Sequence, residues 1–258
     1  MSEPDIAARP PSRNAFVRNL QQRTILSDQD VSDLEALCSN PKRYPAKQDL
    51  IRDGDVPGPL YLFLDGWGCR YKILPEGTRQ ILAFLLPGDC CDLHTRVLDR
   101  MDHSIATVTP SLVVPVDRTR MNALMDKSLA ITRAIWLMQL VDLGISRAWI
   151  TSLGRQSSHA RVAHLICEIY LRAHSFAVDE NAPCRMPISQ IMLADAVGLT
   201  PVHINRVLRS FAEDGIMRLS RGTLTVHDPE ALATIAGFDD SYLKRKVEPV
   251  GASVSHWV

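Results

Sequence analysis

Residues 190–209 limit the possible folds of this 258-residue chain more than any other segment. Their sequence is QIMLADAVGLTPVHINRVLR. A helix-turn-helix needs apolar residues where its two helices cross, a small residue where their backbones meet, and a residue that tolerates positive φ at the turn. The positions that meet these needs in one uninterrupted register are Leu193, Ala194, Val197, Gly198, Leu199, Ile204 and Val207. The segment is therefore predicted to form two helices joined by a tight turn.

The second predicted helix has its own start signal, because Thr200 is a good N-cap and Pro201 suits the first helical position. Once the inner face is assigned, Val202, Asn205, Arg206 and Arg209 point outward. An exposed valine is unusual on a solvated helix, but it suits a helix that enters the major groove of DNA with its N-terminal residues at the base edges. The alternative is a plain helical hairpin within a core.

Each outward residue is given a role in DNA binding. Arg206 is expected to hydrogen-bond O6 and N7 of a guanine, Val202 to contact a thymine methyl group, and Asn205 to contribute to base readout. The side chains and helix ends expected at the phosphate backbone are those of Ser189, Gln190, Thr200, His203, Arg209 and Arg221.

Two short apolar runs, residues 216–219 and 223–226, follow the second helix and are joined by Ser220-Arg221-Gly222. They predict the two strands of a wing, with Arg221 at its tip, and Asp228-Pro229 predicts a closing helix that ends at Gly237. The whole chain has a formal net charge of +0, so a general polyanion binder is excluded and any nucleic-acid site must be local.

Between residues 44 and 117, apolar runs of strand length alternate with turns that contain Gly54, Gly66, Gly77 and Gly88. This rhythm predicts an all-β barrel or roll. A short amphipathic helix is expected before it, over residues 27–38. The predicted strands cover residues 60–64, 69–74, 80–86, 105–108 and 112–116.

Residues 128–157 contain no proline and predict one long helix, followed by another over residues 160–173. The apolar band of the long helix is wide, so it is either a single buried core helix or a helix that packs on the β domain and on a partner chain together. Gly144 and Ala148, four residues apart, would let two such helices approach closely. The residues expected at a dimer interface are Leu137, Leu140, Val141, Gly144 and Ala148.

In this order the elements resemble those of the Crp/Fnr superfamily of bacterial regulators. The likeness is carried by residues 60–66 (LYLFLDG), 153–165 (LGRQSSHARVAHL), 198–206 (GLTPVHINR) and 238–243 (FDDSYL). The resemblance implies an α+β chain with a cyclic-nucleotide-binding-like β-roll (jelly roll), a long dimerisation helix and a C-terminal winged helix-turn-helix. The implied limits are a flexible leader at 1–15, a sensor domain at 16–127, the dimerisation helix at 128–157, the DNA-binding domain at 158–237 and a tail at 238–258.

The resemblance also implies function and partners. Members act as homodimers whose two recognition helices enter successive major grooves of a palindromic double-stranded DNA site, and many contact RNA polymerase. RNA polymerase is therefore an expected partner of this chain.

The sensor departs from the cyclic-nucleotide-binding members of the superfamily. Those members carry a Gly-Glu pair and, further on, an Arg beside Ser or Thr that clamps the phosphate. The matching positions here are Cys91-Asp92-Leu93 and His103-Ser104. Without the arginine a buried phosphate has no bidentate partner, so cyclic nucleotide binding is not expected. Asp92, His103 and Ser104 remain a possible pocket for an unidentified effector.

Metal and redox chemistry are not expected either. The sequence has no N-terminal cysteine cluster of the kind that holds an iron–sulfur centre, and it shows no haem or zinc motif. Cys90, Cys91 and His94 form one local cluster. Adjacent cysteines share a tetrahedral ion poorly, so a structural role is favoured, with one thiol inward and its neighbour in a turn.

Other classes of function fit less well. The chain has no nucleophile–base pair, P-loop or zincin motif, which argues against an enzyme. Its N-terminus has no apolar segment of a signal peptide, and its densest apolar stretch, residues 134–141, is too short for a bilayer, so a soluble cytoplasmic protein is expected. Two hypotheses remain. One is a sequence-specific transcription regulator that responds to an unknown signal, and the other is a ligand- or metal/redox-sensing β-roll protein whose helical domain binds a protein partner.

Overall fold

The computed structural model describes residues 14–91, 99–175 and 184–244. Its N-terminal half is a β-roll of two four-stranded sheets, with strand orders β1-β8-β3-β6 and β2-β7-β4-β5. Neighbouring strands pair antiparallel. The strands are β1 (Lys42–Tyr44), β2 (Asp49–Ile51), β3 (Leu60–Asp65), β4 (Gly68–Ile73), β5 (Arg79–Leu85), β6 (Cys90–Cys91), β7 (Ser104–Thr107) and β8 (Ser111–Val116).

The five strands predicted from sequence are confirmed within a residue or two at each end. The strands β1, β2 and β6 were not predicted, because two or three residues are too few to show an alternating pattern. The four glycines expected in turns all have positive φ values. Gly66 has the least space around it for a side chain. It has a φ of +81°, and a Cβ atom there would lie 2.4 Å from the Ser111 hydroxyl oxygen.

Three short helices pack around the roll: α1 (Ala15–Gln21), α2 (Asp28–Leu37) and α3 (Arg118–Lys127). The helix α2 is the one expected, and Ser27 begins it in a reciprocal capping box with Asp30. Sequence reasoning missed α1, whose seven residues make only two turns, and α3, whose one buried residue, Met121, gives no apolar period. The apolar faces of α1 and α2 join β3, β8 and the first half of α4 in one buried cluster.

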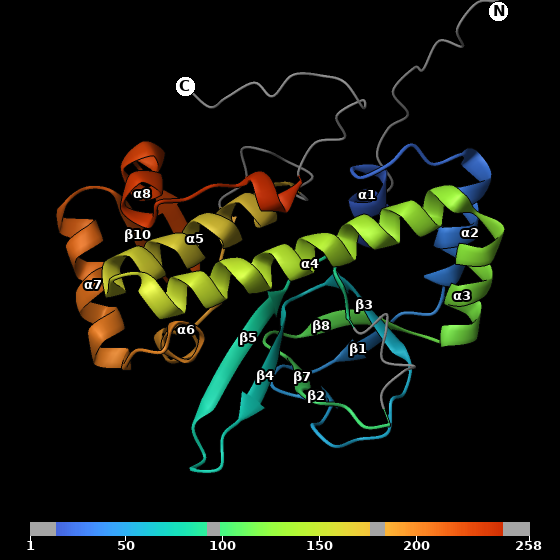
Figure 1. The fold of residues 1–258 in the computed structure, drawn as a ribbon, viewed down its shortest axis with the longest axis horizontal. Helices are drawn as coiled ribbons and strands as arrows, with labels where there is room; N and C mark the ends of the chain where they lie inside the picture. Colours follow the sequence, from blue (N-terminus) through green and yellow to red (C-terminus); the bar gives the residue numbers. More distant parts are fainter. Residues whose placement is uncertain (1–13, 92–98, 176–183, 245–258) are drawn as a thin grey trace, which may run out of the picture.

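The long helix α4 (Leu129–Arg155) begins at the Ser128 cap and runs the length of the molecule above the β-roll (Figure 1). By length and composition it is the one described helix that could cross a membrane, although the core helix of a soluble protein meets the same criteria. The expectation that the apolar stretch is too short for a bilayer considered only residues 134–141, whereas the helix as a whole is long enough. The helix packs on α1, α3, α5 and β5 of its own chain.

The C-terminal half lies at the far end of α4 (Figure 1). It contains α5 (Ser158–Ser175), β9 (Cys184–Arg185), α6 (Gln190–Val197), α7 (Pro201–Glu213), β10 (Met217–Ser220), β11 (Thr223–Val226), α8 (Pro229–Ala236) and the 3₁₀ turn η2 (Ser241–Leu243). The predicted wing is confirmed. Sequence reasoning missed β9, which adds a third strand to the wing sheet in the order β10-β11-β9. The closing helix α8 is capped by Asp228 at its start and by Gly237 at its end, as expected.

Candidate nucleic-acid interface

The helices α6 and α7 cross as the seven-position register requires. Leu193, Ile204 and Val207 are fully buried, and Ala194 and Val197 are buried beside them. Gly198 ends α6 in the left-handed region at a φ of +65°, where its N–H donates to the Ala194 carbonyl. The predicted helix-turn-helix is therefore confirmed, and the inward assignments leave one face of α7 open to solvent.

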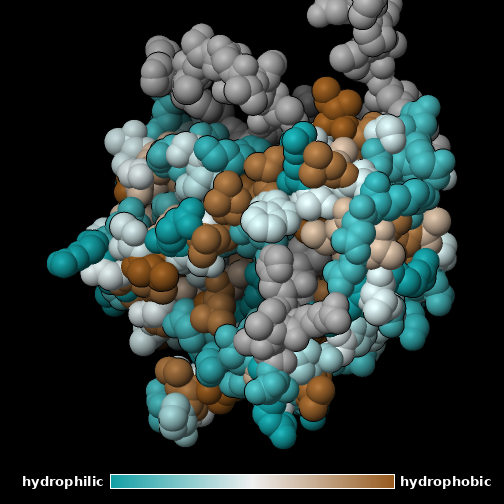
Figure 2. All heavy atoms as spheres, turned by 45° about the vertical axis from the view of Figure 1, so that its right-hand side comes forward, coloured by the Kyte–Doolittle hydropathy of each residue, from teal (hydrophilic) through white to brown (hydrophobic). Residues whose placement is uncertain are grey.

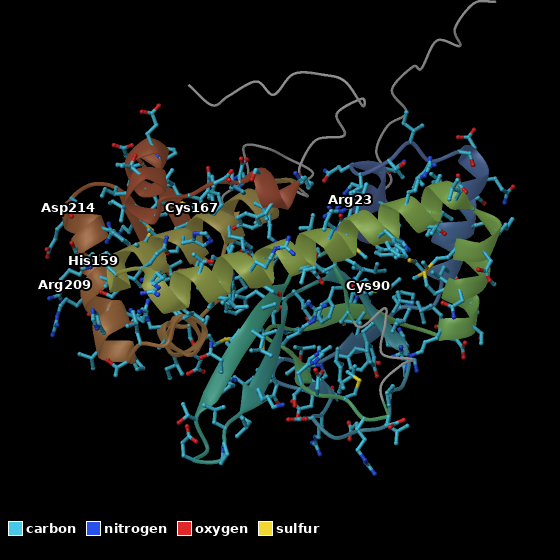
Figure 3. The ribbon with its side chains drawn as sticks, in the orientation of Figure 1. Arg23, Cys90, His159, Cys167, Arg209 and Asp214 are labelled. Carbon is cyan, nitrogen blue, oxygen red and sulfur yellow. The ribbon has the colours of Figure 1, made fainter. Side chains whose placement is uncertain are left out.

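That open face carries the residues predicted to contact DNA. The Thr200 hydroxyl accepts a hydrogen bond from the His203 N–H and caps α7. Val202 is 72% exposed, Asn205, Arg206 and Arg209 are also exposed, and His203 is half-buried. Figure 3 shows Arg209 extending from the outer side of α7, away from the body of the protein. Among the residues that the structure describes, Arg206 and Arg209 make no ion pair, so both keep their donors for a partner.

A contact between the two helices was not anticipated from sequence. The Asn205 side-chain N–H donates to Gln190 Oε1 across 3.3 Å, which joins the second helix to the start of the first. Ser189 beside it is engaged as the cap of α6, because its hydroxyl accepts from the Met192 N–H at 3.2 Å. The two amide side chains are thus presented as a linked pair on the surface predicted to meet DNA.

The wing presents a cation at its tip. Arg221 and Gly222 join β10 to β11 with φ values of +51° and +73°. Two successive positive φ values are typical of the type I′ turn, whose twist matches that of a hairpin. Arg221 is exposed at this turn, as the sequence predicted.

An exposed apolar stripe lies along α4 on the side away from its own core. Apolar side chains gather along the course of this helix in Figure 2. The spacing alternates between three and four residues, which is the heptad pattern of a coiled coil, with arginines at two positions. We call these residues the α4 seam: Leu129, Arg133, Trp136, Leu140, Leu143, Arg147 and Ile150.

The residues predicted at a dimer interface are divided between the α4 seam and the core of their own chain. Leu140 belongs to the seam, and Leu137 and Ala148 are half-buried at its edges. Val141 is only 5% exposed because it packs into the core of its own chain. Gly144 is buried against Tyr242, whose Cβ atom would lie 3.1 Å from a Cβ at the glycine. The small residue therefore admits the chain's own C-terminal segment.

Two of the three predicted sensor residues, His103 and Ser104, lie in the part of the chain that the structure describes. His103 Nδ1 lies 2.7 Å from an Asp102 carboxylate oxygen. Ser104 is buried, and its hydroxyl accepts from the Asp53 N–H at 2.9 Å. Neither residue lines the cavity beside Arg172 or the one beside Trp149. Asp92 lies outside the described residues.

The adjacent cysteines are structural in a way that differs from the prediction. Cys90 and Cys91 both lie in β6 and both are buried, and their side chains enter different core clusters on opposite faces of the strand. The expectation that one of them occupies a turn is wrong, because consecutive strand residues point to opposite faces. His94 lies outside the described residues.

The other thiols are also buried. Burial raises the pKa of Cys38, Cys69 and Cys184 to about 11 and that of Cys167 to about 12, so they are poor thiolates at neutral pH. Within the described residues no three His, Cys, Asp or Glu side chains gather as metal ligands.

Comparison with known proteins agrees with both halves of the structure. The profile of the cyclic nucleotide-binding domain family matches residues 41–128, and that of the Crp-like helix-turn-helix domain family matches residues 160–235. The chain is 25% identical over 198 residues to the nitrogen fixation regulation protein FixK of Azorhizobium caulinodans, covering 76% of this chain and 79% of that protein. It is 26% identical over 204 residues to the transcriptional activator protein FnrL of Cereibacter sphaeroides, covering 78% and 81%.

A solved structure has the same fold. FixK2 from Bradyrhizobium japonicum superposes with a TM-score of 0.68 at 23% sequence identity, over 76% of this chain and 96% of that one. The two matching domain families together span more than half of the chain, in the order that the β-roll, α4 and the winged helix-turn-helix take in the structure. The protein belongs to the Crp/Fnr superfamily of transcription regulators.

Proposed function

We propose that this protein binds a palindromic double-stranded DNA site as a homodimer and regulates transcription there in response to a signal that is still unidentified. The observation that carries the proposal is the outward face of α7, where Val202 and Arg206 are exposed next to the N-terminus that Thr200 caps. An exposed apolar side chain next to an unpaired arginine suits a base edge better than it suits water.

The roles of the individual side chains follow from their positions. Arg206, on the second turn of α7, is placed to read a guanine, and Val202, on the first turn, to contact a thymine methyl group. Asn205 reads bases together with its partner Gln190. Ser189, Thr200, His203, Arg209 and Arg221 surround these readers and hold phosphates.

The α4 seam is proposed as the dimer contact. Apolar residues repeated at heptad spacing are buried when two such helices pair, and a parallel pair would place two recognition helices on one side of the dimer. Half-sites would then lie about one helical turn apart. We also propose the domain limits 16–127, 128–157 and 158–237, action in the cytoplasm, and contact with RNA polymerase. The names of the relatives FixK and FnrL, a regulation protein and a transcriptional activator, support a role in transcription.

The test is Arg206→Ala, measured on a DNA site that the wild-type protein selects from a randomised library and on random DNA of the same length. We expect a loss of about 1–3 kcal/mol on the selected site, with relaxed preference at one base position. Arg209→Ala is the matched control, because loss of a phosphate contact weakens binding to both DNAs alike and lowers the salt slope by about one.

An equal loss on the two DNAs for Arg206→Ala would contradict base readout by this arginine. Failure of the wild-type protein to bind any DNA at low salt would contradict the proposal as a whole and favour a protein partner for the helical domain.

A further inference from the structure

Six charged side chains are gathered where α1, the β-roll, α4 and α5 meet. We call them the junction network: Arg23, Arg70, Asp89, Asp142, Glu168 and Arg172. Arg172 is its centre, since one guanidinium nitrogen donates to Asp89 Oδ2 at 2.6 Å and another donates to Glu168 Oε1 at 3.1 Å. The second Glu168 oxygen accepts from the Trp149 indole N–H at 2.7 Å.

The network joins the two halves of the molecule. Asp89 is held rigidly in the β-roll, because its backbone carbonyl accepts from the Phe63 N–H and its carboxylate accepts from the Leu86 N–H. Arg172 and Glu168 belong to α5, which leads into the helix-turn-helix. The bond between Asp89 and Arg172 is therefore a direct, buried link between the β-roll and the DNA-binding half.

The same network reaches α4. Two guanidinium nitrogens of Arg70 in β4 lie 3.1 Å from Asp142 Oδ2, which ties the roll to the helix that carries the α4 seam. Arg23 follows α1 and lines a small cavity together with Asp89, Asp142 and Arg172. It donates to Asn19, whose side chain in turn donates to the Gly88 carbonyl beside Asp89.

The charges of the network balance, with three arginines against three carboxylates. A buried charge that loses its partner is strongly destabilising, so the network favours the one arrangement in which Arg172 meets Asp89 and Glu168 and Arg70 meets Asp142. The cavity between Arg23, Asp89, Asp142 and Arg172 is about 20 Å³, which suits an ordered water and is too small for an effector. The geometry thus points to a mechanical role.

A second polar contact holds the DNA-binding half to the roll nearby. Arg79 at the start of β5 forms an ion pair of 2.7 Å with Asp195 of α6, and the Gln80 side chain donates to the Ala196 carbonyl at 3.2 Å. With two separate points of attachment, α6 is restrained from rotating as well as from moving away.

We infer that the junction network positions each recognition helix relative to the dimer axis, and that Asp89, Glu168 and Arg172 are positioning residues for binding to a palindrome. The inference rests on the proposed function. Because the β-roll is fixed to α4 and α4 carries the seam, the Asp89–Arg172 link sets how far apart two copies of α7 stand. A dimer with the right spacing gains affinity from engaging both half-sites together, and this gain disappears when the spacing is wrong.

The experiment compares affinity for a selected palindrome with affinity for DNA that holds one half-site, using the full chain. For the wild type the ratio is expected to reach about 10²–10⁴. Asp89→Asn keeps the shape and the backbone contact but removes the charge that holds Arg172. We expect it to lower the ratio at least tenfold and to leave half-site affinity unchanged. The matched control is Asp49→Asn, which neutralises a carboxylate of the roll bonded to the Tyr71 hydroxyl, away from the junction. It should leave the ratio unchanged.

A wild-type ratio preserved in Asp89→Asn would overturn the positioning role. Loss of half-site binding as well would show that this variant is misfolded. Glu168→Gln then decides, because it keeps an acceptor for Trp149 and should lower the ratio in the same way. A wild-type protein without any preference for the palindrome would instead contradict the proposed function itself.

Discussion

Val202 and Arg206 are presented to solvent without any cost to the fold, since the inner face of α7 is filled by Ile204, Val207 and other apolar side chains. Substitutions at the outward positions should therefore change DNA binding and leave stability nearly constant. The side chains of Asn205 and Gln190 are preorganised by the hydrogen bond between them, so less side-chain entropy is lost when they bind DNA.

The turn between β3 and β4 requires a glycine at position 66, because the backbone there has positive φ and a side chain would clash with its neighbours. Gly66→Ala has to tolerate a φ of +81° and a Cβ within 2.6 Å of the Pro110 carbonyl oxygen. Gly77→Ala is the matched control, because it has a φ of +86° but no atom within 4 Å. We expect the control to lower the free energy of unfolding by about 1–2 kcal/mol and Gly66→Ala to lower it clearly further. Urea unfolding measures both, and equal losses would refute the steric argument.

The residues that sequence reasoning placed correctly have requirements that are local. Gly198 must adopt positive φ, Thr200 must cap, and Leu193 must meet Ile204, and all three conditions are visible within one short segment. The environment of Gly144 could not be predicted in this way, because it depends on Tyr242, which is brought to α4 only by the tertiary fold. The Asp89–Arg172 link was missed for the same reason.

Among the elements, α4 combines two surfaces. Leu143→Glu, at a seam position 54% exposed in the monomer, should convert the dimer to a folded monomer because two carboxylates would face each other across the seam. Val141→Glu should instead lower stability strongly, since Val141 is buried in its own chain. Sedimentation velocity with thermal unfolding separates the two effects. A Leu143→Glu protein that remains dimeric would place the interface elsewhere.

The start of α3 should show a charge-dependent cap. Hydrogen bonds from the Thr119 hydroxyl and N–H hold the pKa of Asp117 below its usual value. A lowered carboxyl pKa in the folded state contributes stability above about pH 4 that is lost as the pH falls through the lowered value.

Asp117→Asn keeps a good N-cap without the charge. The wild type should therefore lose stability relative to this variant as the pH falls from 6 to 3, measured by the melting temperature. Asp117→Ser should behave as the asparagine variant does. Parallel curves for wild type and both variants would show that the carboxylate makes no such contribution.

Element length decided which parts of the fold were visible in the sequence. The long strands, α2, α4 and the winged helix-turn-helix each span enough residues for a period or a cap to be recognised. The strands β1, β2, β6 and β9 are held by their neighbours in the sheets and have no signal of their own. The α4 seam could have been found from its heptad spacing, but the wide apolar band of the helix concealed which side faces the core.

In the whole molecule the long helix α4 connects the β-roll at one end to the winged helix-turn-helix at the other (Figure 1). The described sensor residues His103 and Ser104 are engaged within the roll by contacts to Asp102 and Asp53, whereas the outward face of α7 is open to solvent. Ion pairs at the junction and at β5 join the two halves of one chain at two separate points.

The most direct test of the account is selection of DNA by the full-length protein from a randomised library, followed by sequencing of the bound fraction. A homodimer with two recognition helices is expected to enrich an inverted repeat whose half-site centres lie about one helical turn, roughly 10–10.5 base pairs, apart. Enrichment of single, unpaired half-sites, or of no sequence at all, would contradict it.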